Sequence, residues 1–231
     1  MNGRLRTLGA ILGVMGILFV AAGAFSFYKV QEGNASLQAF SAAQGVELAY
    51  NESGQLLDRG EVAGAQAIMT LLTDEWGYPV QASEMNPNDP LVNTGSEYMY
   101  QMAVVSYHTL NGTQTVILDE DFTAPDGTVY TAGTPYEVPV AGRYWADFDR
   151  SNPIDAAVRG QAWTGVAHAL VAELGVGTVT ASALTMGLGL AALFAGVGFT
   201  FLLAGLGLVW VSRAERETSF ARKPVLAGSP V

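Results

Sequence analysis

The chain has 231 residues, a formal net charge of −10 and no cysteine, and 50% of its residues are hydrophobic while only 14% are charged. This length suits one domain with short additional segments. The lack of cysteine excludes a lipoprotein and a disulfide-stapled module, so the domain must be stabilised by its own core. The acidity makes DNA and RNA poor partners.

Two segments are long, apolar and uncharged. The first covers residues 8–28 and the second lies within residues 175–212. Because about 20 apolar residues cross a bilayer as a helix, we expect transmembrane helices at residues 8–28 and 178–211, the second with its entry helix. Residues 1–7 and 212–231 are then short flanking segments, and residues 29–177 form the domain between the two helices.

The first apolar segment has a second interpretation, as a cleavable leader. It follows Arg4 and Arg6 and contains the triplet Ala22-Gly23-Ala24, which has the pattern of a signal-peptidase site. The apolar run nevertheless continues to Tyr28 and Lys29, an aromatic and basic ending that is typical of spanning helices. We therefore expect a permanent membrane anchor, with cleavage after Ala24 as the alternative.

Small residues line one face of each apolar segment. Such stripes let helix backbones approach closely in a membrane, so we expect the two helices to pack on each other or on the helices of a membrane-protein partner. Neither segment carries the ionisable residues that mark a proton path or an ion pore. The predicted helix-packing residues are Gly9, Gly13, Gly16, Gly23, Gly187, Ala191, Ala195, Gly198 and Gly205.

Basic residues predict the orientation of the two helices. Arg4 and Arg6 precede the first helix and a basic group follows the second, whereas Lys29 is the basic residue near the opposite ends. By the positive-inside rule, both termini are cytoplasmic and residues 29–177 are extracytoplasmic, at the plasma membrane. Residues 29–176 hold 5 basic and 19 acidic side chains, a net charge of −14. The basic group after the second helix comprises Arg213, Arg216, Arg222 and Lys223.

The domain between the membrane helices begins with a helical pattern. Apolar residues recur at helical spacing over residues 31–50 and 61–72, the latter opened by Asp58 or a neighbour. Thr94 and Glu97 have the spacing of a capping box, which predicts a third helix that runs to about Leu110.

Strand signals replace the helical pattern after residue 112. The runs TQTVIL, GTVYTA, YEVPV and RYWADF are separated by turn residues, which predicts a small antiparallel meander. Asn152 and Pro153 then begin a helix, which we expect to be near-continuous over residues 155–176 and to enter the second membrane helix. The predicted fold class is an α+β membrane protein, with two transmembrane helices flanking an extracytoplasmic domain of helices and a small antiparallel β-meander.

Candidate catalytic and metal-binding residues are few. His108 and His168 are the two histidines of the chain, and both lie in apolar or aromatic helical segments, where a packed histidine is the ordinary outcome. With a carboxylate they could form the facial triad of a non-haem iron site, but their spacing does not bring them together. The acidic strings LDEDFTAPDG and ADFDRSNPID break the order of an EF-hand loop and are expected to be turns and a helix cap. We therefore predict no catalytic, cofactor-binding or metal-binding residue and no cofactor.

Long strings of the sequence are similar to a known family. They resemble actinobacterial two-span membrane proteins of no established activity, over about residues 48–211. Members are often labelled aromatic ring-opening dioxygenase, and the resemblance implies a host with a single main membrane and a thick wall. The strings are LLDRGEVAGAQAIMTLLTDEWGYPV, NPNDPLVNTGSEYMYQM with SYHTLNGTQTV, YEVPVAGRYWADFDRSNP and QAWTGVAHALVAELGVGTVTAS.

Three functions are compatible with these features. The first is a non-catalytic plasma-membrane accessory or scaffold protein, whose spans dock onto a larger membrane complex or self-associate and whose acidic outer domain contacts a partner. The second is an envelope sensor or ligand-binding protein, which would signal through a partner because the segment after residue 211 is too short for an output domain. The third is an envelope enzyme, such as a ring-opening dioxygenase.

Overall fold

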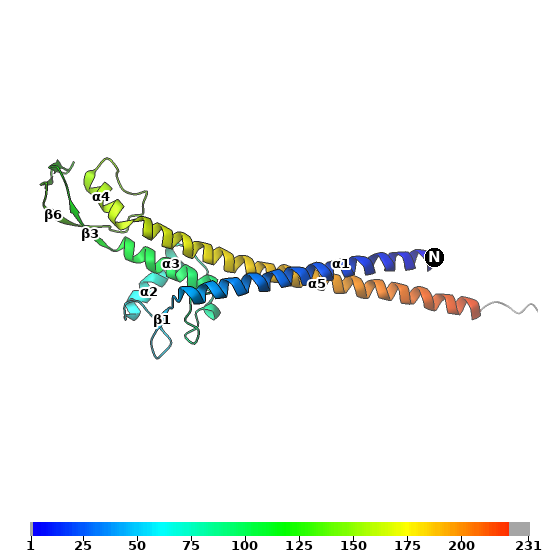
Figure 1. Ribbon diagram of the computed structural model, residues 1–231. Helices are drawn as coiled ribbons and strands as arrows, with labels where there is room; N and C mark the ends of the chain where they lie inside the picture. The colour runs from blue at the N-terminus through cyan, green and yellow to red at the C-terminus, as the bar shows by residue number, and fades with distance from the viewer. Residues whose placement is uncertain (1, 222–231) are drawn as a thin grey trace, which may run out of the picture. The chain divides into compact units, whose positions relative to one another are not determined.

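The computed structural model describes residues 2–221 and divides into two compact units (Figure 1). Among the described residues, the helix-pair unit contains residues 2–35 and 183–221, and the central domain contains Ser36–Ser182. Two helices, α1 (Asn2–Gln44) and α5 (Gly165–Ala221), contribute to both units. The predicted tail at residues 212–231 is helical as far as Ala221, while Arg222 and Lys223 lie outside the described residues.

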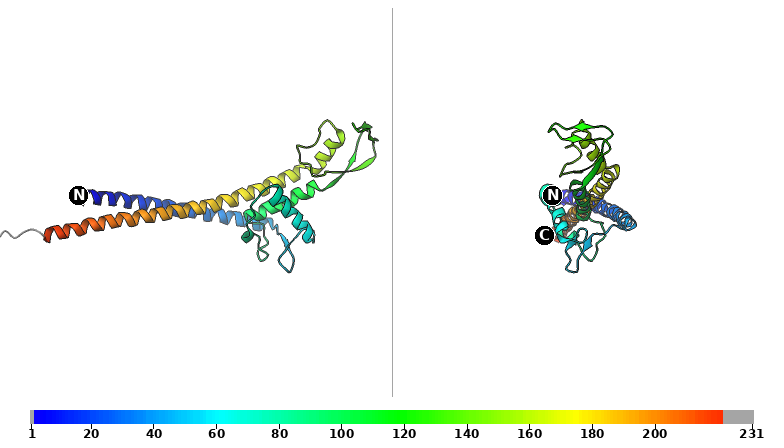
Figure 2. Two further views of the ribbon diagram at one scale, coloured as in Figure 1. Left: turned by 180° about the vertical axis from the view of Figure 1, so that it is seen from behind. Right: turned by 90° about the vertical axis from the view of Figure 1, so that its left-hand side faces the viewer.

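In the helix-pair unit, α1 and α5 lie side by side and antiparallel, as both views show (Figures 1 and 2). Each helix is long and apolar enough to cross a membrane. Only 17% and 11% of their most apolar stretches are buried, whereas the core helix of a soluble protein is mostly buried. The predicted apolar segments at residues 8–28 and 178–211 therefore each lie within one helix of membrane-spanning length. The large exposed side chains of these two helices include Ile17, Leu18, Phe25, Leu203, Leu206 and Trp210.

The central domain is mostly helical. Its helices are α2 (Val62–Thr70), which continues as the π-turn η1 (Leu71–Glu75), the 3-10 turn η2 (Ala82–Glu84), α3 (Gly95–Leu110) and α4 (Pro153–Ala162). The predicted capping box is confirmed, because Thr94 and Glu97 exchange hydrogen bonds at the start of α3. The predicted start of α4 is also confirmed: Asn152 Oδ1 accepts from the backbone N–H of Ile154, and Pro153 occupies the first turn.

Three small two-stranded antiparallel sheets complete the domain. They pair β1 (Ala49–Tyr50) with β2 (Leu56–Leu57), β3 (Thr113–Ile117) with β6 (Pro135–Pro139), and β4 (Phe122–Thr123) with β5 (Val129–Tyr130). The antiparallel strands agree with the sequence analysis, but the predicted meander order was wrong. The β4–β5 hairpin is inserted between β3 and β6, which pair with each other from Thr113 opposite Pro139 to Ile117 opposite Pro135.

Two helix predictions also need correction. The helix expected to be near-continuous over residues 155–176 is interrupted, because α4 ends at Ala162 and α5 begins at Gly165. Trp163 leaves the helical conformation and Thr164 caps the next helix, its Oγ1 accepting from the N–H of Ala167 at 3.1 Å. Asp58 does not cap α2: it begins a tight turn, in which Arg59 and Gly60 both have positive φ.

The core of the central domain has two parts that meet at the π-turn. Leu71 belongs to the part formed with β3, β6 and α4, and Leu72 belongs to the part formed with α3 and β1. A π-turn has one more residue in each hydrogen-bonded turn than an α-helix. In this turn the neighbouring Leu71 and Leu72 pack into different parts of the core. The helix α3 joins them as well, with Tyr100 in one part and Leu110 in the other.

Tyr98 of α3 packs between segments of α1 and α5 inside the central domain. Its hydroxyl lies 2.7 Å from Ser41 Oγ, and the Ser41 proton is used by the carbonyl of Leu37, so the tyrosine donates this bond. Its ring lies against the backbone of Gly177, where a methyl group would come within 2.6 Å of ring carbons. Glycine at 177 is therefore required for the ring to pack at this depth.

We expect Gly177→Ala to destabilise the central domain by about 1–3 kcal/mol, because the added methyl overlaps a buried ring. Gly175→Ala is the matched control on the same helix, since the nearest atom to its added methyl is Met102 Sδ at 4.0 Å. Alanine also favours a helix over glycine, so the control should be neutral or slightly stabilising. Thermal unfolding followed by circular dichroism in mild detergent measures both. Equal melting temperatures for the two variants would contradict this packing.

Candidate functional site

The helix-pair unit brings most of the predicted packing residues into direct contact. A methyl group on Gly16 would lie 2.7 Å from the backbone nitrogen of Leu202 and 2.8 Å from the carbonyl oxygen of Gly198. A methyl group on Gly9 would lie 2.7 Å from the carbonyl oxygen of Gly205. Real side chains do not approach backbone atoms this closely, so these positions accept only glycine at the present helix separation.

These contacts repeat every seven residues along both helices. Gly9, Gly16 and Gly23 are buried on α1, and Ala191, Gly198, Gly205 and Ser212 are buried on α5. A seven-residue period keeps one seam of each helix facing the other when the pair winds with a left-handed twist. We call this set of seven buried positions the small-residue seam.

The remaining predicted packing residues lie differently. Gly13 contributes its backbone, since its nitrogen is 2.8 Å from a methyl built on Gly205, but a methyl on Gly13 itself meets no atom within 4 Å. Gly187 faces only the terminal methyl of Val30, at 2.8 Å. Ala195 lies beside Gly23, whose built methyl is 2.9 Å from the Ala195 nitrogen. The small-residue seam is therefore filled by contacts between α1 and α5, whereas a Cβ at Gly13 would point into open space.

His108 pairs with a carboxylate in the central domain. Its Nε2 lies 2.9 Å from Asp58 Oδ1, and the tight turn at Arg59 and Gly60 places Asp58 there. Tyr100 is 2% exposed, and its hydroxyl has no hydrogen-bond partner among the described residues. Burial, together with the negative charge of Asp58, raises the pKa of Tyr100. His108 and Asp58 supply one histidine and one carboxylate, which is fewer ligands than a facial-triad iron site requires.

His168 belongs to a separate group at the break between α4 and α5. Its ring meets Trp145 edge-on at 5.0 Å between centroids and lies 5.8 Å from Trp163. The Arg159 guanidinium lies over the Trp145 ring at 4.0 Å. We call the following set the aromatic cluster: Trp76, Tyr144, Trp145, Arg159, Trp163 and His168.

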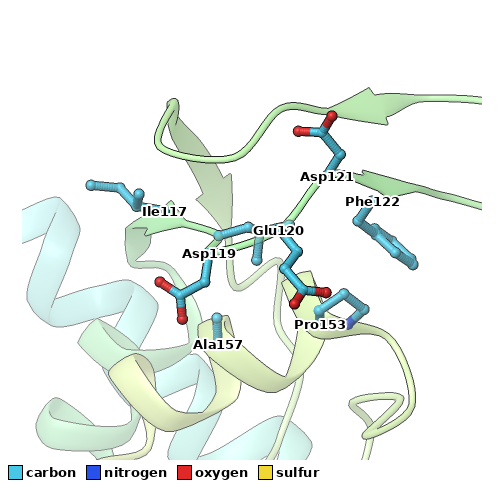
Figure 3. Close-up of a pocket in the computed structure, with 8 residues that line it drawn as sticks. Ile117, Asp119, Glu120, Asp121, Phe122, Pro153 and Ala157 are labelled. Carbon is cyan, nitrogen blue, oxygen red and sulfur yellow. The ribbon is translucent and has the colours of Figure 1, made fainter.

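The acidic strings form turns and one pocket. Asp119, Glu120 and Asp121 line a pocket of about 510 Å³ beside Pro153, and Figure 3 shows their carboxylates pointing in different directions. Asp121 accepts from the N–H of Ala132 at 2.8 Å. No group of three or more histidine, aspartate or glutamate side chains in the described part of the chain is placed to hold a metal ion.

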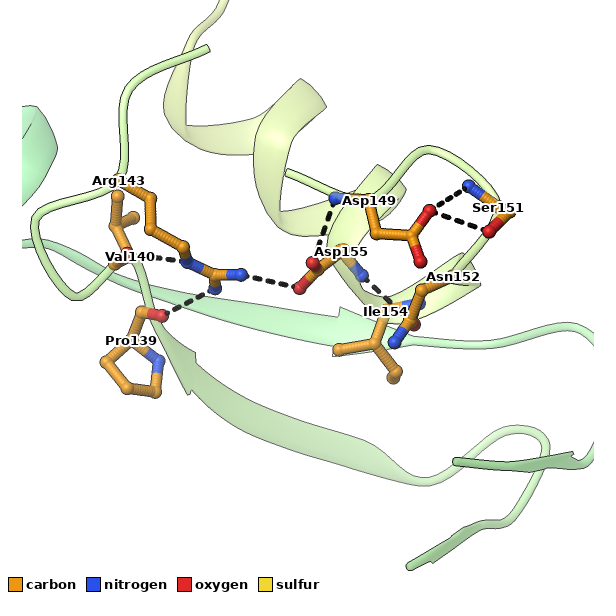
Figure 4. A network of polar contacts seen from close by, with 8 residues as sticks. All are labelled: Pro139, Val140, Arg143, Asp149, Ser151, Asn152, Ile154 and Asp155. Carbon is orange, nitrogen blue, oxygen red and sulfur yellow. Dashed lines mark hydrogen bonds and ion pairs between the residues drawn. The ribbon is translucent and has the colours of Figure 1, made fainter. Parts of the chain in front are cut away.

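The second acidic string fastens a loop to α4 (Figure 4). Arg143 donates to Asp155 at 2.7 Å and to the carbonyl oxygens of Val140 and Pro139. Asp149 accepts from the N–H and hydroxyl of Ser151, which lowers the pKa of its carboxyl group. Because neighbouring groups of the fold occupy these carboxylates, their role is structural: they hold the loop against α4.

Glu97 is the most deeply buried carboxylate of the central domain, with 1% of its surface exposed. Its Oε2 accepts from the N–H of Asn93, the N–H of Thr94 and the hydroxyl of Thr94. Burial raises the pKa of Glu97 despite these bonds. The bonds start α3 and occupy the carboxylate, so its role is to cap the helix.

The aromatic cluster is the group that sequence reasoning missed. The segment RYWADF was interpreted as a strand, but Tyr144 and Trp145 lie in a turn, and Tyr144 donates its N–H to Asp147 Oδ2. A signal was present, because aspartates at 147 and 149 favour turns over strands.

No protein-family model, curated protein or solved structure matches the chain significantly.

Replacement of a seam glycine should weaken the helix pair. Gly16→Leu forces the two backbones apart, and we expect a loss of about 1–3 kcal/mol, as for other overpacked sites. Gly13→Leu is the matched control on the same helix, because a Cβ at this position meets no atom within 4 Å. Thermal unfolding of the full chain in mild detergent compares them. A Gly13→Leu variant that melts as low as Gly16→Leu would contradict the seam.

Glu97→Gln tests the buried cap through its pH dependence. A glutamine oxygen accepts the same bonds without a buried charge, and glutamine is an accepted capping-box residue. Since burial raises the folded pKa of Glu97, its contribution to stability is complete below the ordinary glutamate pKa and is lost as pH rises from there through the raised pKa. The melting temperature of Glu97→Gln relative to wild type should therefore be higher at pH 7 than at pH 4. If the melting temperature of Glu97→Gln relative to wild type were lower at pH 7 than at pH 4, the negative charge of Glu97 would be shown to stabilise the fold.

Proposed function

We propose that this chain is a non-catalytic accessory protein of the plasma membrane. In this proposal α1 and α5 cross the membrane as a pre-paired anchor, and the central domain lies outside the cytoplasm and contacts a partner. The observation that carries the proposal is the small-residue seam, where backbones of the two helices meet while their large apolar side chains face outward. Outward apolar surface of this extent fits lipid or other membrane helices.

The same seam argues for an anchor over a transporter. Helix backbones in contact leave no room for a channel between them, and residues 8–28 and 178–211 contain no aspartate, glutamate, lysine, arginine or histidine. The residues of the small-residue seam already pack against each other within the chain, so docking onto a larger membrane complex would use the outward faces of α1 and α5. Membership of the actinobacterial two-span family is part of this proposal; the two helices are compatible with a two-span membrane protein of any family.

The organisation of the central domain favours binding over catalysis. His108 lies with Asp58 and His168 lies with Trp145 and Trp163, so the two histidines belong to separate groups. The carboxylate of Glu97 caps α3, and the carboxylate of Asp155 is paired with Arg143. The domain also presents two partly exposed aromatic rings, Tyr144 and Trp145, which are residue types enriched at recognition surfaces.

The proposed topology is tested by single cysteines, since the natural chain has none. Ser53→Cys lies at an exposed loop tip of the central domain and should react with an impermeant maleimide in intact, wall-permeabilised cells. Gly3→Cys, next to Arg4 and Arg6, should react only after lysis, because basic residues stay on the cytoplasmic side. The reverse pattern would overturn the orientation, and a mature chain that begins at Phe25 would show a cleaved leader.

The accessory role is tested by purification in mild detergent from the native host. We expect a tagged chain to retain an integral-membrane partner or a second copy in a constant ratio. Outward-face variants, such as Leu203→Ala, should reduce retention without lowering the melting temperature, because this side chain is exposed on α5. A chain that is recovered alone and monomeric under these conditions would contradict the role.

A further inference from the structure

We propose that the aromatic cluster is a docking surface for an acidic segment of a protein partner, in which a carboxylate lies beside an apolar side chain. This inference rests on the proposed function, because it names the surface by which the central domain meets its partner. Its support comes from the exposure of two rigid aromatic rings and from an arginine without a carboxylate partner.

The exposed rings are held in fixed positions. Tyr144 and Trp145 are 38% and 37% exposed. Tyr144 stacks on Trp163 at 5.9 Å, and its hydroxyl accepts from Trp76 Nε1 at 2.8 Å. Trp145 is packed by Arg159 at 4.0 Å and His168 at 5.0 Å. Rigid aromatic side chains lose little conformational entropy on binding, and Trp, Tyr and Arg are the residue types enriched at interface hot spots.

Arg159 supplies the electrostatic part of the surface. Its Nε and Nη1 are buried and have no hydrogen-bond partner among the described residues. The nearby Arg143 is neutralised by Asp155, whereas Arg150 and Arg159 form no salt bridge in the described part of the chain. A carboxylate is the strongest hydrogen-bond acceptor for a guanidinium, and because Nε and Nη1 are buried, a partner carboxylate would have to approach Arg159 through Nη2.

Charge complementarity favours an acidic partner at this place. The central domain has 4 basic and 18 acidic side chains, and residues 143–159 hold three of the arginines together with three aspartates, so this stretch is neutral while the rest of the domain carries a net charge of −14. An acidic segment is therefore repelled by most of the domain and least repelled here, which gives specificity by exclusion as well as by contact. A neutral sugar would make no use of Arg159, and faces of Trp145 and Tyr144 that could stack on it are covered by Arg159 and Trp163.

The test uses the purified full chain in detergent and a phage-displayed library of random peptides of about twelve residues. Enriched peptides should carry Asp or Glu next to an aromatic or aliphatic residue. A synthetic copy of one such peptide, measured by fluorescence polarisation, should bind at least about tenfold more weakly to Trp145→Ala and Arg159→Gln, since hot-spot losses exceed 1.4 kcal/mol. Its affinity should also fall as salt rises.

Controls separate binding from folding. Phe40→Ala removes an aromatic side chain that is 48% exposed elsewhere in the central domain and should leave peptide binding unchanged. His168→Ala removes an exposed member of the cluster, so it tests the surface even where Arg159→Gln lowers the melting temperature. Arg159→Lys keeps the charge but loses the planar guanidinium and should restore binding only in part.

Several outcomes would overturn the inference. These are no enrichment over empty micelles, enriched peptides without acidic residues, an affinity unchanged by both Trp145→Ala and His168→Ala, or binding of a soluble oligosaccharide such as chitohexaose in place of peptides. The assay is performed on isolated protein, so it fails or succeeds independently of membrane topology and of partner retention in the host. A failed topology test with successful peptide binding would therefore remove the anchor and keep the surface.

Discussion

The close approach of two helix backbones is the constraint on which the helix-pair unit depends. Where Gly16 meets Gly198 and Gly9 meets Gly205, a single methyl group would overlap a backbone atom of the opposite helix. Glycine lowers helix stability in water, and in the proposed membrane setting lipid would provide no hydrophobic force to hold two apolar helices together. Dispersion contacts between closely packed backbones would then supply the attraction, and the small residues make these contacts possible.

The central domain uses the same device once, at Gly177. The Tyr98 ring fills the space that a side chain at 177 would take, and its hydroxyl reaches Ser41. The domain therefore has a large aromatic residue at a place where two helical segments approach, with its polar end hydrogen-bonded, as buried tyrosines usually are. Tyr100 departs from this rule, since its buried hydroxyl is unpartnered among the described residues.

The polar groups of the domain are divided between structure and surface. Glu97, Asp149 and Asp155 start helices or close turns, and each has at least one carboxylate oxygen that accepts from a nearby N–H, hydroxyl or guanidinium group. Arg159 is different, because its guanidinium lies over the ring of Trp145 and forms no salt bridge among the described residues. This contrast is the observation from which we propose the aromatic cluster, and not an acidic loop, as the surface for a partner.

The sequence by itself determined the local features of this protein. The capping box at Thr94 and Glu97, the cap at Asn152 and the two long apolar helices follow from residue types at short spacing, because capping bonds and helix hydrophobicity are local. The break at Trp163 and Thr164 lacks proline, so the local pattern allowed a continuous helix. The pairing of β3 with β6, the meeting of Asp58 with His108 and the aromatic cluster bring together residues far apart in the chain. Only the tertiary structure decided these contacts, because they depend on how whole elements pack and on which backbone atoms a glycine leaves uncovered.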